Sequence, residues 1–353
     1  MARLPARVKR TFPPPDPWFG GGLGTCMELD EIEWRTREVL PAWKESGLSL
    51  TIIEKGGSGR LFVRVVREDS GESLIAMHYN LDRADNARFA CVTDFLSRHA
   101  IPAPRILERR IDLNLLWVED LGTLDLGNLA GTDWTTSRRP AYQSALRAVF
   151  PLHRLPESAA PDDLPELEKP FDAALYEWEQ TYFLTHFVER FVSAEKAARL
   201  RSDPAFAALR DELATLPRAL VHRDFQSTNV MLRDGGSYLI DYQGLRWGLP
   251  EYDLASMIYD PYSEFTAEET DDLIGFYFSL KEEAGDTESR AAFEKRLTQC
   301  AMQRLMQALG AYGFLSEVKG KTEFLAHIPT AKKRLLELSR KEGGVPGLAA
   351  VLA

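Results

Sequence analysis

Three oxygen-bearing side chains follow short apolar runs in A-L-V-H-R-D-F-Q-S-T-N-V-M-L at 219–232 and in Y-L-I-D-Y-Q at 238–243. Asp224 and Asn229 lie between two of these runs, and Asp241 follows a third. Mg²⁺ prefers carboxylate and amide oxygens, so Asn229 and Asp241 are candidate metal ligands and Asp224 is a candidate acid–base group. This set fits phosphoryl transfer, which needs an orienter for the acceptor hydroxyl and a metal to neutralise the phosphate.

The turn D-G-G-S at 234–237 predicts a tight hairpin between the second and third apolar runs. Such a hairpin would bring Asn229 and Asp241 to the same rim. Each of the three polar residues, taken alone, is also explained as a loop-capping residue or a turn former. Their order and spacing between short strands favour the catalytic interpretation.

The remaining elements predict an α+β protein. Apolar, β-branched runs indicate strands over 48–54, 61–66, 73–77 and 113–118. Helical spacing indicates helices over 28–45, with a break at Pro41, and over 86–99. After residue 122 helical patterns dominate, over 142–155, 171–192, 195–216, 268–284, 288–314 and 323–341. We therefore expect a small antiparallel sheet with one helix, followed by a larger, mostly helical part.

The segments H-R-D-x-x-x-x-N and I-D-Y-Q together resemble the catalytic loop and metal-binding segment of the protein-kinase-like superfamily. The resemblance implies a bilobal fold and the cofactors ATP and Mg²⁺. It divides the chain into a nucleotide-binding lobe (28–118) and a catalytic and acceptor-binding lobe (119–353). The proline- and glycine-rich start of the chain indicates a flexible tail (1–27) before them. The connector over 117–122 would meet the adenine through its backbone. Within that connector the expected contacts are Glu119 and Leu121.

A glycine-rich turn, G-G-S-G-R at 56–60, lies between two predicted strands. Its residues fit a loop whose backbone N–H groups cover nucleotide phosphates. They are Gly56, Gly57, Ser58, Gly59 and Arg60. The alternative is that a hairpin uses glycine for conformational reasons alone.

Two features depart from the superfamily pattern. Met77 stands where the usual phosphate-binding lysine of the third strand would be, and the 86–99 helix has no Glu to pair with such a lysine. We hypothesise that Arg60 or Arg64 supplies the cation instead. A nucleotide-binding pseudokinase scaffold is the alternative.

The stretch 241–262 has no A-P-E segment and resembles the aminoglycoside and small-molecule phosphotransferase branch. There Asp253 would start a helix, and we interpret it as a structural anchor rather than a catalytic group. Within the branch, the motifs are most similar to the anomeric kinases of N-acetylmuramate and N-acetylglucosamine, in which Met often replaces the strand lysine. The resemblance implies ATP-dependent phosphorylation of the anomeric hydroxyl of an amino sugar, for cell-wall sugar recycling.

Acceptor-binding candidates lie in the helical part. Gln226 stands where many small-molecule kinases have His, and its amide is suited to a phosphate or a sugar hydroxyl. Glu179 and Tyr182 lie on the 171–192 helix, and Asp260 and Tyr262 follow a helix expected over 251–259. For Glu179 a solvated helix face is an equal alternative. Aminoglycosides, choline and homoserine remain alternative acceptors.

Bulk composition excludes several classes. The chain has 353 residues and a formal net charge of -10, and it lacks the basic cluster of a nucleic-acid binder. Its three cysteines are dispersed, which suits a reducing cytoplasm. The N-terminal stretch lacks the apolar core of a secretory signal, and no apolar run is long enough to span a membrane. We expect a cytoplasmic protein with a small-molecule substrate.

Overall fold

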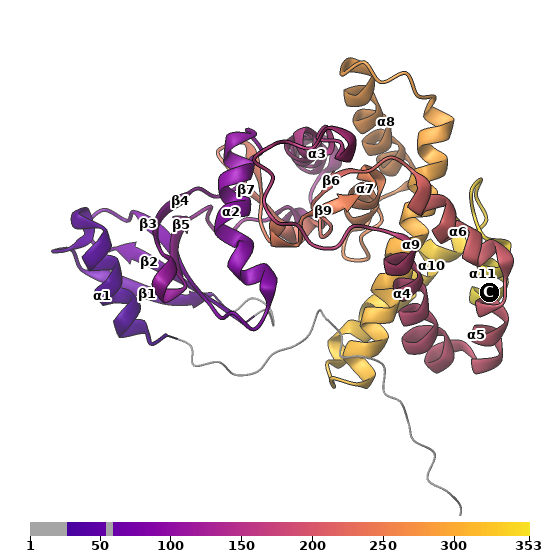
Figure 1. The fold of residues 1–353 in the computed structure, drawn as a ribbon, viewed down its shortest axis with the longest axis horizontal. Coiled ribbons are helices and arrows are strands. Elements are labelled where there is room, and N and C mark those ends of the chain that lie inside the picture. Colours follow the sequence, from indigo (N-terminus) through magenta and orange to yellow (C-terminus); the bar gives the residue numbers. More distant parts are fainter. Residues whose placement is uncertain (1–26, 54–58) are drawn as a thin grey trace, which may run out of the picture. The chain divides into compact units, whose positions relative to one another are not determined.

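The computed structural model describes residues 27–53 and 59–353, and the chain forms two compact units (Figure 1). The smaller unit extends to Ala87 and also includes Ile106–Asp120, and the larger unit comprises Arg88–Arg105 and Leu121–Ala353. Strands dominate the first and helices the second, so the predicted α+β class is confirmed. The tail expected over 1–27 lies outside the described residues except for Met27.

The smaller unit is built on a five-stranded antiparallel sheet with the order β1-β2-β3-β5-β4. The strands are β1 (Leu48–Ile53), β2 (Arg60–Arg67), β3 (Ser73–Tyr79), β4 (Ile106–Arg110) and β5 (Leu115–Glu119). The helix α1 (Leu29–Val39) is followed by a 3₁₀ turn (Pro41–Trp43), so the break predicted at Pro41 is present. The edge strand β4 was not predicted, because its short E-R-R segment alternates without a β-branched run.

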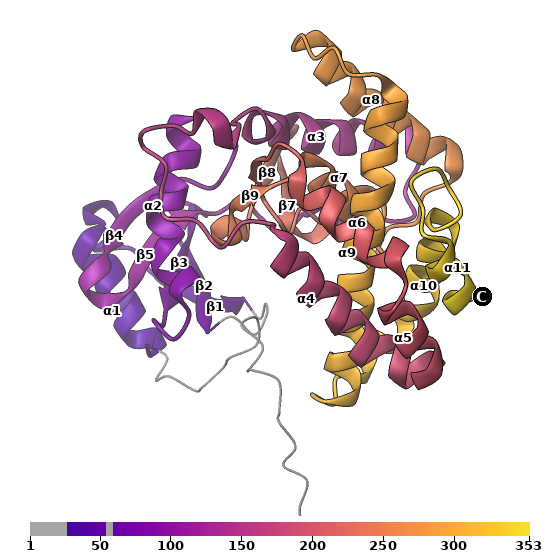
Figure 2. The same cartoon turned by 45° about the vertical axis from the view of Figure 1, so that its right-hand side comes forward.

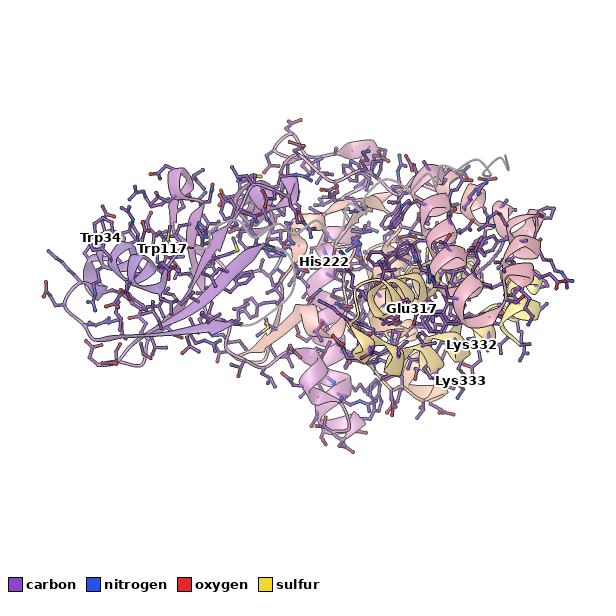
Figure 3. The ribbon with its side chains drawn as sticks, turned by 90° about the horizontal axis from the view of Figure 1, so that it is seen from below. Trp34, Trp117, His222, Glu317, Lys332 and Lys333 are labelled. Atoms are coloured by element: carbon purple, nitrogen blue, oxygen red, sulfur yellow. The ribbon has the colours of Figure 1, made fainter. Side chains whose placement is uncertain are left out.

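One face of this sheet packs against α1. Val63, Val65 and Trp117 of the strands are buried there with Ile32 of α1. The Trp117 indole Nε1 donates a hydrogen bond of 2.8 Å to the Thr36 hydroxyl (Trp117 is labelled in Figure 3). Because side chains alternate along a strand, the residues between these core positions belong to the opposite face.

The opposite face carries the candidate nucleotide-binding positions. Cross-strand pairing places Phe62 opposite Met77 and Met77 opposite Leu116, while Arg64 pairs with Ile75. Residues paired in this way share a face, so Arg64 and Met77 lie on the same side of the sheet. Met77 is fully buried in this apolar surround.

The larger unit is mostly helical. Its helices are α3 (Arg139–His153), α4 (Ala173–Phe183), α5 (Ala194–Arg201), α6 (Pro204–Thr215), α7 (Pro250–Ile258), α8 (Ala267–Glu283), α9 (Arg290–Glu317), α10 (Ile328–Leu338) and α11 (Pro346–Leu352). The boundary between the units falls inside α2 (Ala84–Arg98). The 28-residue helix α9 packs against α4, α7 and α10 (Figure 2). No helix of the described residues is long and apolar enough to cross a membrane.

Three predicted helices are not continuous α-helices. The helix expected over 195–216 is two helices, because Pro204 begins α6 and the Asp203 side chain accepts the Ala205 N–H as its cap. The helix expected over 171–192 ends in a π-helical segment (Leu184–Val192). Similarly, the one expected over 323–341 begins as a 3₁₀ turn (Thr322–His327) before α10.

Two short antiparallel ribbons carry the motifs of the candidate catalytic segment. The strand β6 (Ala219–Val221) pairs with β9 (Arg246–Gly248), and β7 (Val230–Arg233) pairs with β8 (Gly236–Leu239). Between β7 and β8, Asp234 and Gly235 both have positive φ, at 52° and 75°. That is the backbone of a two-residue hairpin turn, so the predicted hairpin is confirmed.

Candidate active site

Hydrogen bonds to its own backbone carbonyls hold the loop between β6 and β7. The Asn229 Nδ2 donates to the Asp224 carbonyl at 3.0 Å, and the Asn229 N–H donates to the Gln226 carbonyl at 2.9 Å. The Gln226 N–H in turn donates to the Asp224 carbonyl at 2.8 Å. These bonds hold Asp224 and Asn229 at fixed positions in one compact turn.

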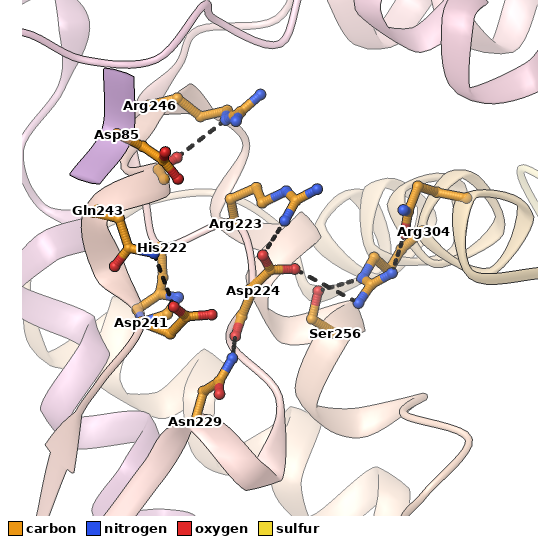
Figure 4. A network of polar contacts seen from close by, with 12 residues as sticks. Asp85, His222, Arg223, Asp224, Asn229, Asp241, Gln243, Arg246, Ser256 and Arg304 are labelled. Carbon is orange, nitrogen blue, oxygen red and sulfur yellow. Dashed lines mark hydrogen bonds and ion pairs between the residues drawn. The ribbon is translucent and has the colours of Figure 1, made fainter. Parts of the chain in front are cut away.

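Asp241 comes to the same place through the hairpin. The Ile240 N–H, immediately before it, donates to the Asn229 carbonyl at 3.0 Å. Asp241 itself has a left-handed backbone, with φ 62°, and its Oδ1 accepts a 2.8 Å hydrogen bond from Gln243 Nε2 (Figure 4). The structure therefore brings Asp224, Asn229 and Asp241 together.

The donor set of Asn229 and Asp241 fits a hard divalent cation. Because the Asn229 amide nitrogen is committed to the Asp224 carbonyl, the amide oxygen is the atom suited to a metal. Asp241 contributes a carboxylate whose orientation is fixed by Gln243. An amide oxygen and a carboxylate oxygen, completed by phosphate oxygens and water, are the ligands that Mg²⁺ takes in nucleotide sites.

The Asp224 carboxylate lies between two guanidinium groups. Arg223 Nη1 donates to its Oδ2, and Arg304 Nη2 lies 3.9 Å from its Oδ1 (Figure 4). Arg304 comes from α9, about 80 residues further along the chain. The site therefore places positive charge on two sides of the candidate acid–base group.

Asp253 fixes the start of the catalytic loop. Its Oδ2 accepts the His222 backbone N–H at 2.6 Å, and its Oδ1 accepts the Arg223 backbone N–H at 2.8 Å. His153 Nε2 lies 3.0 Å from Oδ2, and its Nδ1 lies 2.7 Å from the Tyr277 hydroxyl. Because Asp253 is fully buried, these bonds are what compensates its charge.

The role expected for Asp253 needs one correction. The helix α7 begins at Pro250 with Leu249 as its cap residue, so Asp253 does not start the helix. Pro250 supplies the start because its fixed φ suits the first helical turn. Asp253 has the anticipated structural role, but the backbone that it anchors belongs to the loop at His222 and Arg223.

Asp260 is hydrogen-bonded to the loop between β6 and β7 at the 3₁₀ turn Ser227–Asn229. Its Oδ2 accepts from the Ser227 hydroxyl at 3.2 Å, and its Oδ1 accepts the Tyr262 N–H at 3.0 Å. Only 3% of Asp260 is exposed, and burial raises the pKa of its carboxyl. Its contacts therefore position Ser227 and Tyr262.

Glu179 on α4 is buried rather than solvated. Its two oxygens accept hydrogen bonds from the Tyr252 hydroxyl at 2.8 Å and from Gln303 Nε2 at 3.0 Å. Burial raises the pKa of the Glu179 carboxyl. The alternative of a solvated helix face is wrong, because this face of α4 packs against α9.

The two candidate tyrosines have different surroundings. Tyr262 is 37% exposed, and its ring lies edge-on to His327 with centroids 4.2 Å apart. Tyr182 is buried, stacking on Trp178 with centroids 4.9 Å apart and packing near Phe314. Tyr262 is therefore the tyrosine with a ring face accessible to a ligand.

In the smaller unit, Gly59 immediately precedes β2, which begins at Arg60, while Gly56, Gly57 and Ser58 lie outside the described residues. Gly59 has φ 69°, a backbone conformation that favours glycine, and a Cβ there would approach the Asn80 side chain to 2.6 Å.

Arg64 makes a two-pronged ion pair with Asp120, through Nε at 2.7 Å and Nη2 at 3.0 Å. Glu119 is the last residue of β5, and Leu121, the first residue of its segment of the larger unit, is buried.

Several residues of the site were not predicted. Arg304 lies in a long, largely buried helix with no motif around it, so only its tertiary contact with Asp224 identifies it. His153 is likewise distant from the loop that it supports through Asp253. Gln243 stands in the I-D-Y-Q motif, and its position two residues after Asp241 was the one local signal available.

Family membership follows from the comparison with known proteins. The model of the phosphotransferase enzyme family matches residues 50–293, which include most of the sheet, the loop between β6 and β7, and α7. The chain belongs to this family, whose members transfer phosphoryl groups. The solved structures that it resembles are small-molecule kinases, which agrees with the predicted protein-kinase-like fold.

Two curated relatives have the same name, N-acetylmuramate/N-acetylglucosamine kinase. The Pseudomonas putida protein is 25% identical over 82% of this chain and 83% of its own length. The Neisseria meningitidis protein is 25% identical over 88% of this chain and 91% of its own. Among solved structures, an amicoumacin kinase in complex with AMP-PNP and Ca²⁺ aligns with a TM-score of 0.59 and 14% identity, over 90% of this chain and 96% of that one.

Proposed function

We propose that this protein is a Mg²⁺- and ATP-dependent kinase of the anomeric hydroxyl of an N-acetylated amino sugar, N-acetylglucosamine or N-acetylmuramate. The observation that carries this proposal is the similarity to two kinases named for those sugars, over 82% and 88% of the chain. The reaction would serve cell-wall sugar recycling. We place it in the cytoplasm because the three cysteines are dispersed.

The charges around Asp224 support a sugar rather than a cationic acceptor. Choline and aminoglycosides carry positive charge, which the guanidinium groups of Arg223 and Arg304 would repel. A sugar presents hydroxyl oxygens, which accept hydrogen bonds from guanidinium donors.

The catalytic roles follow from the bonding of the loop. Asp224 would hold the anomeric hydroxyl and accept its proton as the oxygen attacks the phosphorus. An anomeric hydroxyl is more acidic than an ordinary alcohol, so positioning contributes more than base strength. Asn229 and Asp241 would hold the metal, which supplies charge neutralisation on the transferring phosphate when bound.

For the nucleotide, we propose that residues 28–118 form the binding lobe and residues 119–353 the acceptor-binding lobe. The glycine-rich turn and Arg60 would cover the phosphates, and the backbone at Glu119 and Leu121 would meet the adenine. Arg64 replaces the missing lysine. Its position on the same sheet face as Met77 supports this assignment.

Burial divides the acceptor candidates into two groups. Gln226 is part-exposed and Tyr262 is 37% exposed, so we propose that both contact the sugar. Glu179, Tyr182 and Asp260 are buried. We propose that these three act by positioning the residues that they contact: Tyr252 for Glu179, Trp178 for Tyr182, and Ser227 and Tyr262 for Asp260.

A panel of acceptors tests the proposal. ATP, Mg²⁺ and the protein are incubated with N-acetylglucosamine, N-acetylmuramate, glucose, galactosamine, choline and an aminoglycoside, and the products are read by phosphorus NMR. We expect an anomeric phosphate from an N-acetylated sugar and none from its methyl glycoside, in which the C1 oxygen is blocked. Turnover of choline without turnover of any sugar would reject the proposal.

A nucleotide-binding scaffold is a second candidate, favoured by one observation. Met77 is fully buried between Phe62 and Leu116, so the usual lysine cation is missing from this strand. Against it stands the assembled set of Asp224, Asn229 and Asp241. Intact ATP binding without Mg²⁺-dependent phosphate transfer to any acceptor would favour the scaffold.

A further inference from the structure

Arg304 has a guanidinium group that the fold only partly satisfies. Its Nε donates to the Ser256 hydroxyl at 3.0 Å, and its Nη1 donates to the Gln307 side chain. Its Nη2 lies 3.9 Å from Asp224 Oδ1, which is too long for a hydrogen bond. Within the described part of the chain Nη2 donates no other hydrogen bond, although only 15% of the side chain is exposed.

Solvent reaches Nη2, because it is not among the buried side-chain nitrogens of the described residues that lack a hydrogen-bond partner. A ligand oxygen can take the place of that water. Ser256 and Gln307 fix the other two nitrogens, so Nη2 is held in one orientation beside the reacting carboxylate. A fixed cation with unused donors is the arrangement expected of an anion-binding residue.

The position of Arg304 indicates which reactant it meets. Figure 4 shows Arg304 and Asp241 on opposite sides of Asp224. Since Asp241 is on the side of the candidate metal, Arg304 lies on the side left for the acceptor. Tyr312 lies about two turns further along α9. Its ring packs against that of Tyr262, with the two ring centroids 6.4 Å apart, so aromatic side chains lie beyond Arg304 on this helix.

We propose that Arg304 determines acceptor specificity by binding a carboxylate, so that the enzyme prefers an acidic N-acetylated amino sugar over its neutral counterpart. The inference rests on the proposed function and names the acceptor class within it. The Nη2 donors form charge-assisted hydrogen bonds with a carboxylate, and a neutral sugar offers only hydroxyl oxygens at that place.

A cycle that changes enzyme and ligand together tests the proposal. The kcat/KM values of the unaltered enzyme and of Arg304→Gln are measured with N-acetylmuramate, with its methyl ester and with N-acetylglucosamine. Charge-assisted hydrogen bonds predict that the unaltered enzyme prefers the free acid over the ester by about 10- to 100-fold. In Arg304→Gln this ratio is expected to fall toward one, and in Arg304→Lys to take an intermediate value.

The ratio separates recognition from structural damage. A variant that merely misplaces Asp224 or loosens the fold lowers kcat/KM for the acid and the ester alike, and leaves their ratio unchanged. Arg296→Gln is the matched control, since it removes another arginine of α9 whose partners are Glu251 and Glu288. Its acid-to-ester ratio is expected to equal that of the unaltered enzyme.

The outcomes are distinct. An unchanged ratio in Arg304→Gln, or no preference for the acid in the unaltered enzyme, overturns the role of Arg304 while leaving the kinase proposal intact. Absence of turnover with both sugars and the ester rejects the proposed function, and the role of Arg304 falls with it. Should Arg304→Gln fail to fold, the Arg304→Lys ratio decides alone: a value equal to that of the unaltered enzyme overturns the proposal.

Discussion

The carboxylate of Asp253 holds the backbone of His222, with 2.6 Å between Asp253 Oδ2 and the His222 nitrogen. The same carboxylate accepts the next N–H, that of Arg223, whose backbone has a positive φ of 80°. A non-glycine residue adopts this conformation only when its surroundings impose it. Asp253 thus compensates the strained backbone that places Asp224.

Replacing Asp253 by Asn is expected to lower both stability and turnover. The amide can accept at only one atom, so one loop N–H loses its acceptor, and the unfolding free energy should fall by about 2–4 kcal/mol. Urea unfolding and steady-state kinetics measure the two effects. Asp271→Asn, on an exposed part of α8, is the control and should stay within about 0.5 kcal/mol. Unchanged stability in Asp253→Asn would contradict the anchoring role.

Replacing Asp224 by Asn should lower kcat by about 10²- to 10⁴-fold while nucleotide affinity stays near its original value. The amide cannot accept the proton of the acceptor hydroxyl, whereas the metal-binding pair is untouched. Kinetics with an N-acetylated amino sugar and calorimetric titration with ATP measure these quantities. Full activity in this variant would remove Asp224 from the mechanism.

Replacing Asp241 by Ala should abolish the response of the enzyme to Mg²⁺. We expect kcat at saturating metal to fall by about 100-fold or more, because a carboxylate ligand is lost. Activity measured across a Mg²⁺ titration tests this. Asp234→Asn removes a carboxylate from the same hairpin and keeps a residue that tolerates its positive φ of 52°. That control should behave like the unaltered enzyme; activity retained in Asp241→Ala would refute the metal assignment.

Glu179 should make stability depend on pH. Burial raises its pKa above the ordinary value of 4.5, so the folded protein holds this proton more tightly than the unfolded chain. The stabilisation that the protonated Glu179 gives to the fold is therefore complete below the ordinary pKa. It is lost as the pH rises through the raised pKa of the folded protein.

Glu179→Gln removes this dependence and keeps one acceptor for Tyr252. We expect the unfolding free energy of Glu179→Gln, relative to the unaltered protein, to increase between about pH 4 and about pH 8. Denaturant unfolding across this range provides the measurement. If the difference in unfolding free energy between the two proteins stays constant with pH, burial does not raise the pKa of the Glu179 carboxyl.

Arg64 is expected to contact the nucleotide phosphates. Arg64→Ala should raise the KM for ATP by about 10-fold, as expected for the loss of a charge-assisted hydrogen bond. Asp120→Asn is the matched variant, because it breaks the same ion pair and leaves the guanidinium in place. If Arg64→Ala leaves the KM for ATP unchanged, Arg64 does not contact the nucleotide. If Asp120→Asn raises the KM for ATP as much as Arg64→Ala does, the ion pair has a structural role only.

Local patterns predicted most elements. The two-residue turn at Asp234 and Gly235 sets the register of β7 and β8, which is why Asn229 and Asp241 could be placed together from sequence. The helix over 195–216 was predicted as continuous because its apolar spacing runs through Pro204. In the structure a new helix begins at Pro204, because the Asp203 side chain caps it and the proline cannot continue the preceding helix.

The amino-acid sequence by itself determined the candidate catalytic set, because Asp224, Asn229 and Asp241 lie within one loop and one hairpin whose geometry is local. Only the tertiary structure decided what surrounds that set. Arg304, Asp253 and Glu179 reach the site or its support from helices whose packing depends on contacts distant in sequence. Helical periodicity marks which face of such a helix is buried, but the partner of a buried polar group depends on how the helices pack.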